Sequence, residues 1–307
     1  MSINNYKDSW NNRVTSLKTG AIAVDGSTDE ATLVSNGDWT AAQLRAALDI
    51  QPEDTILELG CGVARIGKQL AADCKHWIGT DISENMIEQA KARTADLDNV
   101  SFVALKRNDL SGVEDDSIDK VYSVAVLCHM DKEDLFNYVR EVRRVLKPGG
   151  VAYLETWNMD DRVGWKRWQY EADNWFISEH SERKDVARNQ FCHPNEFALY
   201  VEKSGLESLA FFHDSSWNQI IAGKDLSEQA VQEWQQRLAD HKDQIIYTDV
   251  FNQLFEYAVD VTYNAIHPSE MMTFIDGLGE LPEADLFRTF LIGLWKDNTE
   301  LWGACDH

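Results

Sequence analysis

A short apolar run, a glycine turn and a helical pattern, in that order, limit the fold of this chain more than any other feature. Residues 55–59 lie between Pro52 and Gly60 and are mostly apolar with β-branched members, which predicts a buried strand. Gly60 and Gly62 predict a tight turn in which the backbone can approach a ligand closely. Apolar residues at helical spacing over 64–72 predict the helix that follows. This order is typical of the first βαβ unit of a nucleotide-binding α/β sheet.

The residues of the turn discriminate between nucleotides. The dinucleotide fingerprint needs a third glycine where this chain has Arg65, and Glu58 would repel a pyrophosphate. A carboxylate there suits a ligand with a cationic amino-acid tail, such as S-adenosylmethionine (SAM). The stretch from Glu58 to Ala64 resembles the glycine loop of class I SAM-dependent methyltransferases. It departs from that family at Ala64, where a third glycine is usual, so we expect a slightly tighter site.

Six further apolar runs predict the rest of a sheet. They cover residues 76–82, 100–105, 119–127, 151–156, 206–212 and 217–222, and helices are predicted over 38–48, 84–94, 131–146 and 195–204. The resemblance implies a doubly wound, mostly parallel, seven-stranded Rossmann-like sheet. We predict a SAM-binding domain over residues 1–225, which includes a leader at 1–50, and an α-helical extension over 226–307.

Side chains after the predicted strands are the candidate cofactor contacts. Asp81 follows Gly62 by 19 residues, where an acid in this architecture accepts hydrogen bonds from ribose hydroxyls; an ordinary turn acid is the alternative. The resemblance implies that Asp109 meets the adenine amino group and that Leu110 packs on the ring, whereas Asn-Asp also favours a simple turn. The predicted cofactor-binding residues are Glu58, Gly60, Cys61, Gly62, Asp81, Ile82, Asn108, Asp109, Leu110 and Leu127. No metal site is expected.

His129 follows the fourth predicted strand at its carboxyl end, where ligands of open α/β sheets bind. An imidazole there can take a proton from a hydroxyl or ammonium acceptor, or it can serve as a pocket wall or a cofactor contact. A base is not obligatory, because methyl transfer from a sulfonium is a direct displacement that positioning can accelerate. The Asn/Asp-Pro-Pro-aromatic signature of nucleobase amine methyltransferases does not occur at this position.

Aromatic and basic residues in two segments are the candidate acceptor contacts. The resemblance implies that the leader folds over the active site, although its aromatic residues can equally anchor it to the core. Residues 157–176 contain four tryptophans and either cover the acceptor pocket or form a hydrophobic lid with basic residues in solvent. The predicted substrate-binding residues are Tyr6, Trp10, Trp157, Arg162, Trp165 and Arg167. The arginines favour an amino-acid-like acceptor, and its methylated N, O or S atom is left open.

The charge balance argues against polyanionic partners. The chain has 52 acidic and 29 basic residues and a net charge of −23, which should repel nucleic acid and anionic membranes. Five scattered cysteines without a CxxC pair predict neither a metal knot nor a disulfide framework. With no secretory signal or membrane span expected, these features favour a cytoplasmic protein with a small-molecule substrate.

The leading hypothesis is a SAM-dependent methyltransferase that acts on a small molecule. A non-catalytic SAM-sensing protein is an alternative; it would recruit a partner through an exposed apolar face of residues 226–307. A nicotinamide-dependent oxidoreductase is disfavoured by Glu58 and Arg65. The three or four amphipathic helices predicted in the extension would cap the active site, form a homodimer face or pack on the preceding domain.

Overall fold

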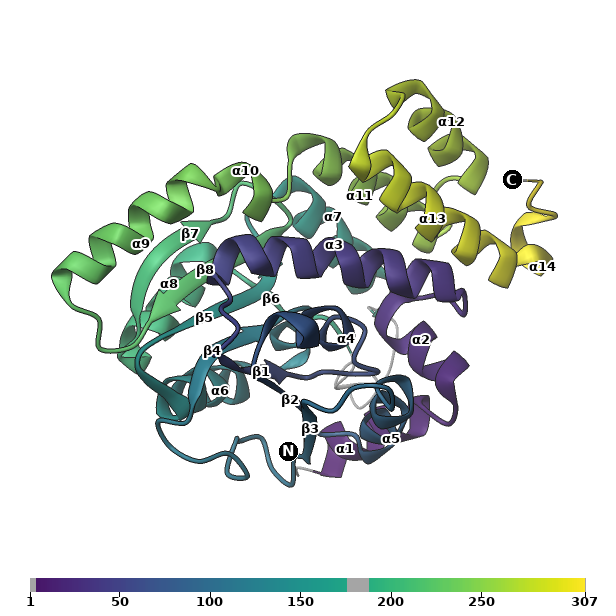
Figure 1. Ribbon diagram of the computed structural model, residues 1–307. Helices are drawn as coiled ribbons and strands as arrows, with labels where there is room; N and C mark the ends of the chain where they lie inside the picture. Colours follow the sequence, from purple (N-terminus) through teal and green to yellow (C-terminus); the bar gives the residue numbers. More distant parts are fainter. Residues whose placement is uncertain (1–3, 176–187, 307) are drawn as a thin grey trace.

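A mixed β-sheet runs through the molecule and is covered by helices on both faces (Figure 1). The computed structural model describes residues 4–175 and 188–306. The long strands are β1 (Thr55–Leu59), β2 (His76–Asp81), β3 (Val100–Ala104), β4 (Ile118–Ser123), β5 (Leu146–Asn158), β7 (Glu207–Phe212) and β8 (Trp217–Gly223). Their order in the sheet is β3-β2-β1-β4-β5-β8-β7, and the two-residue strand β6 (Phe191–Cys192) pairs with β5 outside this path. In the described sheet, β8 runs antiparallel to both of its neighbours, β5 and β7, and the other strand pairs are parallel. The predicted doubly wound, mostly parallel sheet is confirmed.

One face of the sheet packs against α6 (Lys132–Val145) and α8 (Pro194–Ser204). Leu57 and Leu59 of β1 point to this face, because alternate residues of a strand share a face. They share an apolar core with Leu135 and Val139, which lie four residues apart and therefore on one side of α6. This is the helix that the sequence predicts over 131–146.

The opposite face packs against α3 (Glu30–Leu48), which has 19 residues. α4 (Gly67–Leu70), the 3₁₀ turn η1 (Ala71–Asp73), α5 (Glu84–Arg93), α9 (Glu228–Asp240) and α10 (Lys242–Ile245) lie on the same side. Leu44 and Leu48 of α3 meet Ile56 and Trp77 of the sheet in a second core. We call this side the α3 face.

The leader forms two further helices, α1 (Asn4–Arg13) and α2 (Leu17–Asp25), beside α5. Asn85 at the start of α5 holds the end of α1 and the residue that follows it, because its Nδ2 donates to the carbonyl oxygens of Asn11 at 3.0 Å and Val14 at 2.8 Å. Ser83 also donates to Asn11 Oδ1, at 2.8 Å. These contacts place the leader at the carboxyl end of β2, where Asp81 lies.

The C-terminal helices divide into two groups. α9 and α10 contribute Leu238 and Ile245 to the core on the α3 face. α11 (Asp249–Thr262), α12 (Pro268–Leu278) and α13 (Pro282–Asp297) form a separate apolar cluster, against which Trp39 of α3 packs, and α14 (Thr299–Trp302) follows them. Figure 1 shows α13 beside one end of α3, with α12 beyond it. The sequence predicts three or four helices here and the structure describes six, two of them with four residues each. The boundary at residue 225 stays a prediction.

The end of α13 is tied back to the leader. Asp297 accepts hydrogen bonds from Thr28 N–H at 2.6 Å, from the Thr28 hydroxyl at 2.6 Å and from the Ser27 hydroxyl at 3.0 Å. Ser27 and Thr28 lie between α2 and α3, so the two ends of the chain support one another. Within the described residues, no helix has both the length and the apolar character that crossing a membrane requires.

A pair of glycine substitutions tests the packing on the α3 face. Gly67 begins α4 directly against Trp77, and an added Cβ would overlap the indole ring. Because Trp77 is fully buried, Gly67→Ala should lower the free energy of unfolding by about 1–3 kcal/mol. The control is Gly277→Ala in α12, where a Cβ meets nothing within 4 Å, and it should leave stability unchanged or raise it by up to about 1 kcal/mol. Urea unfolding measures both; equal stability of the two variants would contradict this packing.

Candidate active site

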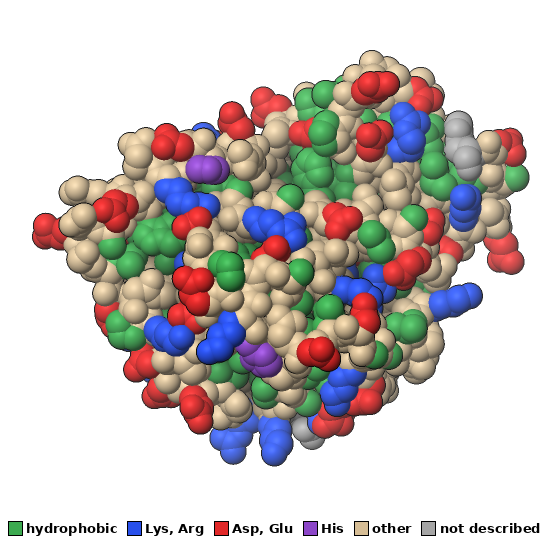
Figure 2. Space-filling view, in the orientation of Figure 1, with side chains coloured by type: hydrophobic (Ala, Val, Ile, Leu, Met, Phe, Trp, Pro, Cys, Tyr) green, Lys and Arg blue, Asp and Glu red, His purple; other side chains and the backbone are tan. Residues whose placement is uncertain are grey.

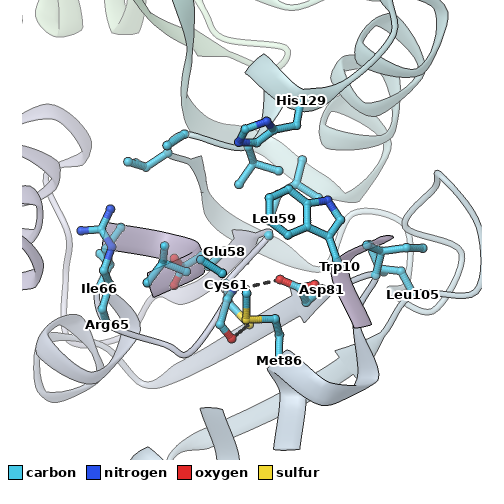
Figure 3. Close-up of a pocket in the computed structure, with 18 of the residues that line it drawn as sticks. Trp10, Glu58, Leu59, Cys61, Arg65, Ile66, Asp81, Met86, Leu105 and His129 are labelled. Carbon is cyan, nitrogen blue, oxygen red and sulfur yellow. Dashed lines mark hydrogen bonds between the residues drawn. The ribbon is translucent and has the colours of Figure 1, made fainter. Parts of the chain in front are cut away.

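A cavity lies beyond the carboxyl ends of β1 and β4, where the strand order reverses, which is the usual ligand position in a doubly wound sheet. Its volume is about 150 Å³. Figure 3 shows Trp10 and His129 on one side of it and Glu58, Cys61 and Asp81 on the other. We call it the cofactor cavity.

The glycine turn between β1 and α4 needs residues without a side chain. Gly60 has φ 74° and Gly62 has φ 51°, in the left-handed region that favours glycine. A Cβ on Gly60 would clash with the Val126 side chain, and one on Gly62 would lie 2.8 Å from Val24 Cγ1 in α2. Ala64 also has a left-handed φ, of 59°, at the position where the resembling family usually has glycine. The chain thus keeps the glycine-type backbone there.

Asp81 accepts hydrogen bonds at both of its oxygens, and one of these bonds comes from the glycine turn. Oδ2 accepts a hydrogen bond from Gly62 N–H at 2.9 Å, and Oδ1 accepts one from Ser83 N–H at 2.8 Å. Burial raises the pKa of Asp81 to about 6, and the hydrogen bonds from Ser83, Gly62 and Ile82 oppose that rise. The carboxylate therefore shapes the turn, which is the alternative role, and it also lines the cofactor cavity. Its contact with ribose hydroxyls stays a prediction.

Glu58 is the second acid of the cofactor cavity and is buried. Its Oε2 accepts a hydrogen bond from the Tyr122 hydroxyl at 2.7 Å, and that hydroxyl oxygen accepts one from Trp77 Nε1 at 2.9 Å. Burial raises the pKa of Glu58 to about 8, against the opposing effects of the Tyr122 bond and the Arg65 charge. A cation placed in the cavity would favour the ionised carboxylate.

A larger cavity, of about 630 Å³, adjoins the first. Ala125 and His129 line both of them, as do Trp10 and Val24 of the leader. The sheet, α3 and the C-terminal helices build the remaining wall, whose aromatic members are Trp39, Trp157, Trp217, Tyr247, Phe251, Phe255, Phe287 and Phe290. We call this the aromatic cavity.

His129 lies at the junction of the two cavities. It ends the short 3₁₀ helix η2 (Leu127–His129), which follows β4. The Trp10 ring meets its imidazole edge-on, with ring centroids 5.2 Å apart. Among the predicted residues, His129 is therefore in a position to contact both a cofactor and an acceptor.

The predicted cofactor residues divide into two sets. Glu58, Gly60, Cys61, Gly62, Asp81 and Ile82 line the cofactor cavity. The remaining four, Asn108, Asp109, Leu110 and Leu127, are not among the described residues that line it. Asp109 Oδ1 accepts a hydrogen bond from Ser111 N–H at 3.2 Å, which is the turn foreseen as the alternative, and Leu110 is fully buried. Their adenine-binding role stays a prediction.

The predicted acceptor residues divide in the same way. Trp10, Trp157 and Arg167 line the aromatic cavity. Tyr6 packs in the core, where its hydroxyl oxygen accepts a hydrogen bond from Asp131 N–H at 3.0 Å. In α7 (Arg162–Trp175), Arg162 pairs with Glu256 of α11, and Trp165 is 49% exposed and packs on Trp168. Phe176, the last residue of the predicted aromatic segment, lies outside the described residues.

Sequence reasoning missed Glu155 and the aromatic residues of the C-terminal helices. Glu155 carries the only charge in the predicted strand 151–156, and a charge inside a buried strand is a usable signal. Phe251 and Phe255 gave no such signal, because their helical spacing is equally typical of packing. Trp217 is the first residue of the predicted strand 217–222, where a tryptophan is also compatible with ordinary burial.

Comparison with known proteins agrees with this geometry. Residues 56–150 match the family described as methyltransferase domain. The chain contains a class I SAM-dependent methyltransferase domain. Methyltransferase GfsG of Streptomyces halstedii is 32% identical to it over 122 residues, which are 38% of this chain and 43% of that relative. The chain thus covers less than half of that relative's length.

Solved structures share the fold of the methyltransferase domain. The N-methyltransferase NodS from Bradyrhizobium japonicum, solved with S-adenosyl-L-homocysteine, aligns with a TM-score of 0.51 and 16% identity, over 72% of this chain and 100% of that one. The [4+2]-cyclase SpnF aligns with a TM-score of 0.50 and 17% identity, over 62% and 81%. These likenesses establish the fold alone, and a cyclase among them shows that the fold does not dictate the reaction.

The residues of the cofactor cavity fit SAM. Its walls carry two buried acids, which suit the cationic groups of the methyl donor, and an apolar wall formed by Ile82, Met86 and Leu105. Arg65 is the one guanidinium or ammonium among the described lining residues, and Asp25 of α2 pairs with it at 3.4 Å. A pyrophosphate in this cavity would lie beside the acids Glu58 and Asp81, and Arg65, which could otherwise bind it, is already paired with Asp25.

Binding of SAM to the methyltransferase domain should release a proton near pH 7. Because the pKa of Glu58 is about 8, the free protein holds this carboxyl mainly protonated, and a cation in the cavity lowers its pKa. Calorimetric titration in two buffers with different ionisation enthalpies measures the release. Glu58→Gln, which carries no titratable proton, should release fewer protons than the wild type; identical release by both proteins would contradict this account of Glu58.

Proposed function

We propose that this protein transfers the methyl group of SAM to a small-molecule acceptor held in the aromatic cavity. The observation that carries the proposal is the junction of the two cavities, where Ala125 and His129 line both. An acceptor in the larger cavity would thus meet a methyl donor in the smaller one. When bound, SAM supplies an electrophilic methyl carbon on a cationic sulfur, and the protein's part is to position the acceptor.

The residues of the junction have two possible tasks. His129 takes a proton from the acceptor or forms a wall that orients it. Trp10 and Val24 of the leader cover the cofactor cavity and keep water from the reacting groups.

In a turnover assay, His129→Ala should lower the rate at unchanged SAM affinity, and an unchanged rate would remove the proton-transfer role.

The C-terminal helices favour catalysis over partner recruitment. A recruiting module would expose an apolar face, yet among the described residues 226–306 the large hydrophobic side chain that stands exposed is Leu301, at 59%. Tyr247, Phe251 and Phe255 instead face the aromatic cavity. We infer that residues 226–307 complete the acceptor site. The homodimer predicted through the same helices is a separate proposal that a sizing measurement decides.

The surface charge supports a small acceptor. Acidic side chains are spread over the face seen in Figure 2, with fewer lysines and arginines between them and no large basic patch. The net charge of −23 would repel a nucleic-acid acceptor.

The direct test is to incubate the protein with methyl-labelled SAM and fractionated small metabolites. The label should move to an acceptor, and Asp81→Ala should raise the Kd for SAM roughly 10- to 100-fold, as expected for the loss of about 1.5–3 kcal/mol of charged hydrogen bonding. Asp119→Asn is the matched control, since Asp119 also accepts a backbone hydrogen bond, from Thr55 N–H at 2.9 Å, but lies at the amino end of β4. It should lower stability and leave SAM affinity unchanged.

Two results would oppose the proposal. If the protein binds SAM and the label reaches no metabolite fraction, the sensing alternative gains support. If Asp81→Ala lowers stability and leaves SAM affinity unchanged, as Asp119→Asn should, Asp81 is structural only.

A further inference from the structure

We propose that the acceptor is an arylalkylamine, with a flat apolar skeleton held by the aromatic cavity and an ammonium group that pairs with Glu155. This inference rests on the proposed function, because it names the class of molecule that the methyl-transfer site would take. It is carried by the charge and the ring geometry of the aromatic cavity.

Glu155 is a buried carboxylate that hydrogen-bonds only to neutral groups in the described part of the chain. Its Oε1 accepts from Ala125 N–H at 3.1 Å, and its Oε2 accepts from the hydroxyls of Tyr153 at 2.8 Å and Tyr247 at 3.2 Å. The side chain is 1% exposed and lines the aromatic cavity. A buried carboxylate that forms no ion pair is costly, so an occupant that places a positive charge directly beside it would be favoured.

The neighbouring cations of the cavity already have acidic partners. Arg65 lies 3.4 Å from Asp25, and Arg167 lies 3.5 Å from Glu171. Arg13 extends over the Trp10 ring at the leader side of the cavity. Among the described residues, none places an ammonium or guanidinium nitrogen within ion-pair distance of Glu155. Its charge is therefore the one that a cationic ligand can match.

Glu155 lies beside a stack of aromatic rings. Glu155 and Trp157 are two residues apart on β5 and share a face of the strand. Trp157 stacks on Trp217, its partner on β8, with ring centroids 4.4 Å apart, and on Phe255 of α11 at 5.4 Å. Flat apolar groups fit such walls, and a volume of about 630 Å³ lies in the range of small-molecule sites.

The ring faces also favour positive charge. The Arg167 guanidinium lies 4.6 Å from the centre of the Trp157 ring, so one side of the stack already holds a cation. Burial raises the pKa of Glu155 to about 7, and the hydrogen bonds from Tyr153, Ala125 and Tyr247, together with the charge of Arg65, oppose this. An ammonium beside the carboxylate would favour its ionised form, whereas a ligand carboxylate there would meet like charge.

Ala125 places this acid close to the transfer site. Its φ of 55° is left-handed, and in this conformation its N–H donates to Glu155. Because Ala125 lines both cavities, the ammonium pocket adjoins the cofactor cavity.

Three probes with one skeleton test the inference: 2-phenylethylamine, 2-phenylethanol and 3-phenylpropionate. Equilibrium dialysis at about pH 8 keeps the amine cationic and Glu155 mainly ionised. The wild type should bind the amine at least about tenfold more tightly than the carboxylate and more tightly than the alcohol. Glu155→Gln should remove most of the amine's advantage over the alcohol. Glu196→Gln is the control, since Glu196 also accepts a tyrosine hydroxyl bond, from Tyr200 at 2.7 Å, but lies outside the described cavity wall.

The inference is overturned if the wild type binds the carboxylate as tightly as the amine, or if Glu155→Gln keeps the full preference. Should Glu155→Gln fail to fold, the wild-type series decides the question alone. A SAM titration of the same preparation tests the proposed function separately from the class of the acceptor. SAM binding without preference for the amine refutes this inference and spares the proposed function, whereas amine preference without SAM binding refutes the proposed function.

Discussion

The two cavities depend on two buried carboxylates on the α3 face of the sheet, each held by a tyrosine hydroxyl. Glu58 of β1 and Glu155 of β5 each accept a hydrogen bond from a buried tyrosine hydroxyl of the same sheet, Tyr122 and Tyr153 respectively. Burial raises the pKa of both acids, and neutral hydroxyl donors compensate only part of the cost of burying a charge. Such acids lower stability in an apolar core, and they favour the binding of a cationic ligand placed beside them. Each of them lines one of the two adjoining cavities.

The sheet alone does not close either cavity. The leader supplies Trp10 and Val24 above the glycine turn, and the C-terminal helices supply Phe251 and Phe255 opposite the ends of β5 and β8. Asp297 connects these two additions through its hydrogen bonds to the turn between α2 and α3. Residues before and after the matched stretch 56–150 thus line the same two adjoining cavities.

Local pattern predicted the scaffold well and the lining of the aromatic cavity only in part. The bounds of β1 and most of the sheet follow from apolar runs between glycines and prolines, and the glycine turn followed from its residues. α3 begins eight residues before its predicted start, because the polar stretch around Asn36 hides the helical period. The 3₁₀ turn that holds His129 ends β4 earlier than its apolar run suggests, since Ala125 turns the chain with a left-handed φ. Pairings such as Trp157 with Phe255 join residues almost a hundred positions apart, and periodicity carries no information about such contacts.

The most direct test of the central claim is a crystal structure of the protein with S-adenosyl-L-homocysteine. We predict that the ligand lies in the cofactor cavity between Glu58 and Asp81, with the aromatic cavity still open beside it and His129 at the boundary. A ligand that occupies the aromatic cavity against Glu155 and Trp157, and leaves the glycine turn uncontacted, would contradict it.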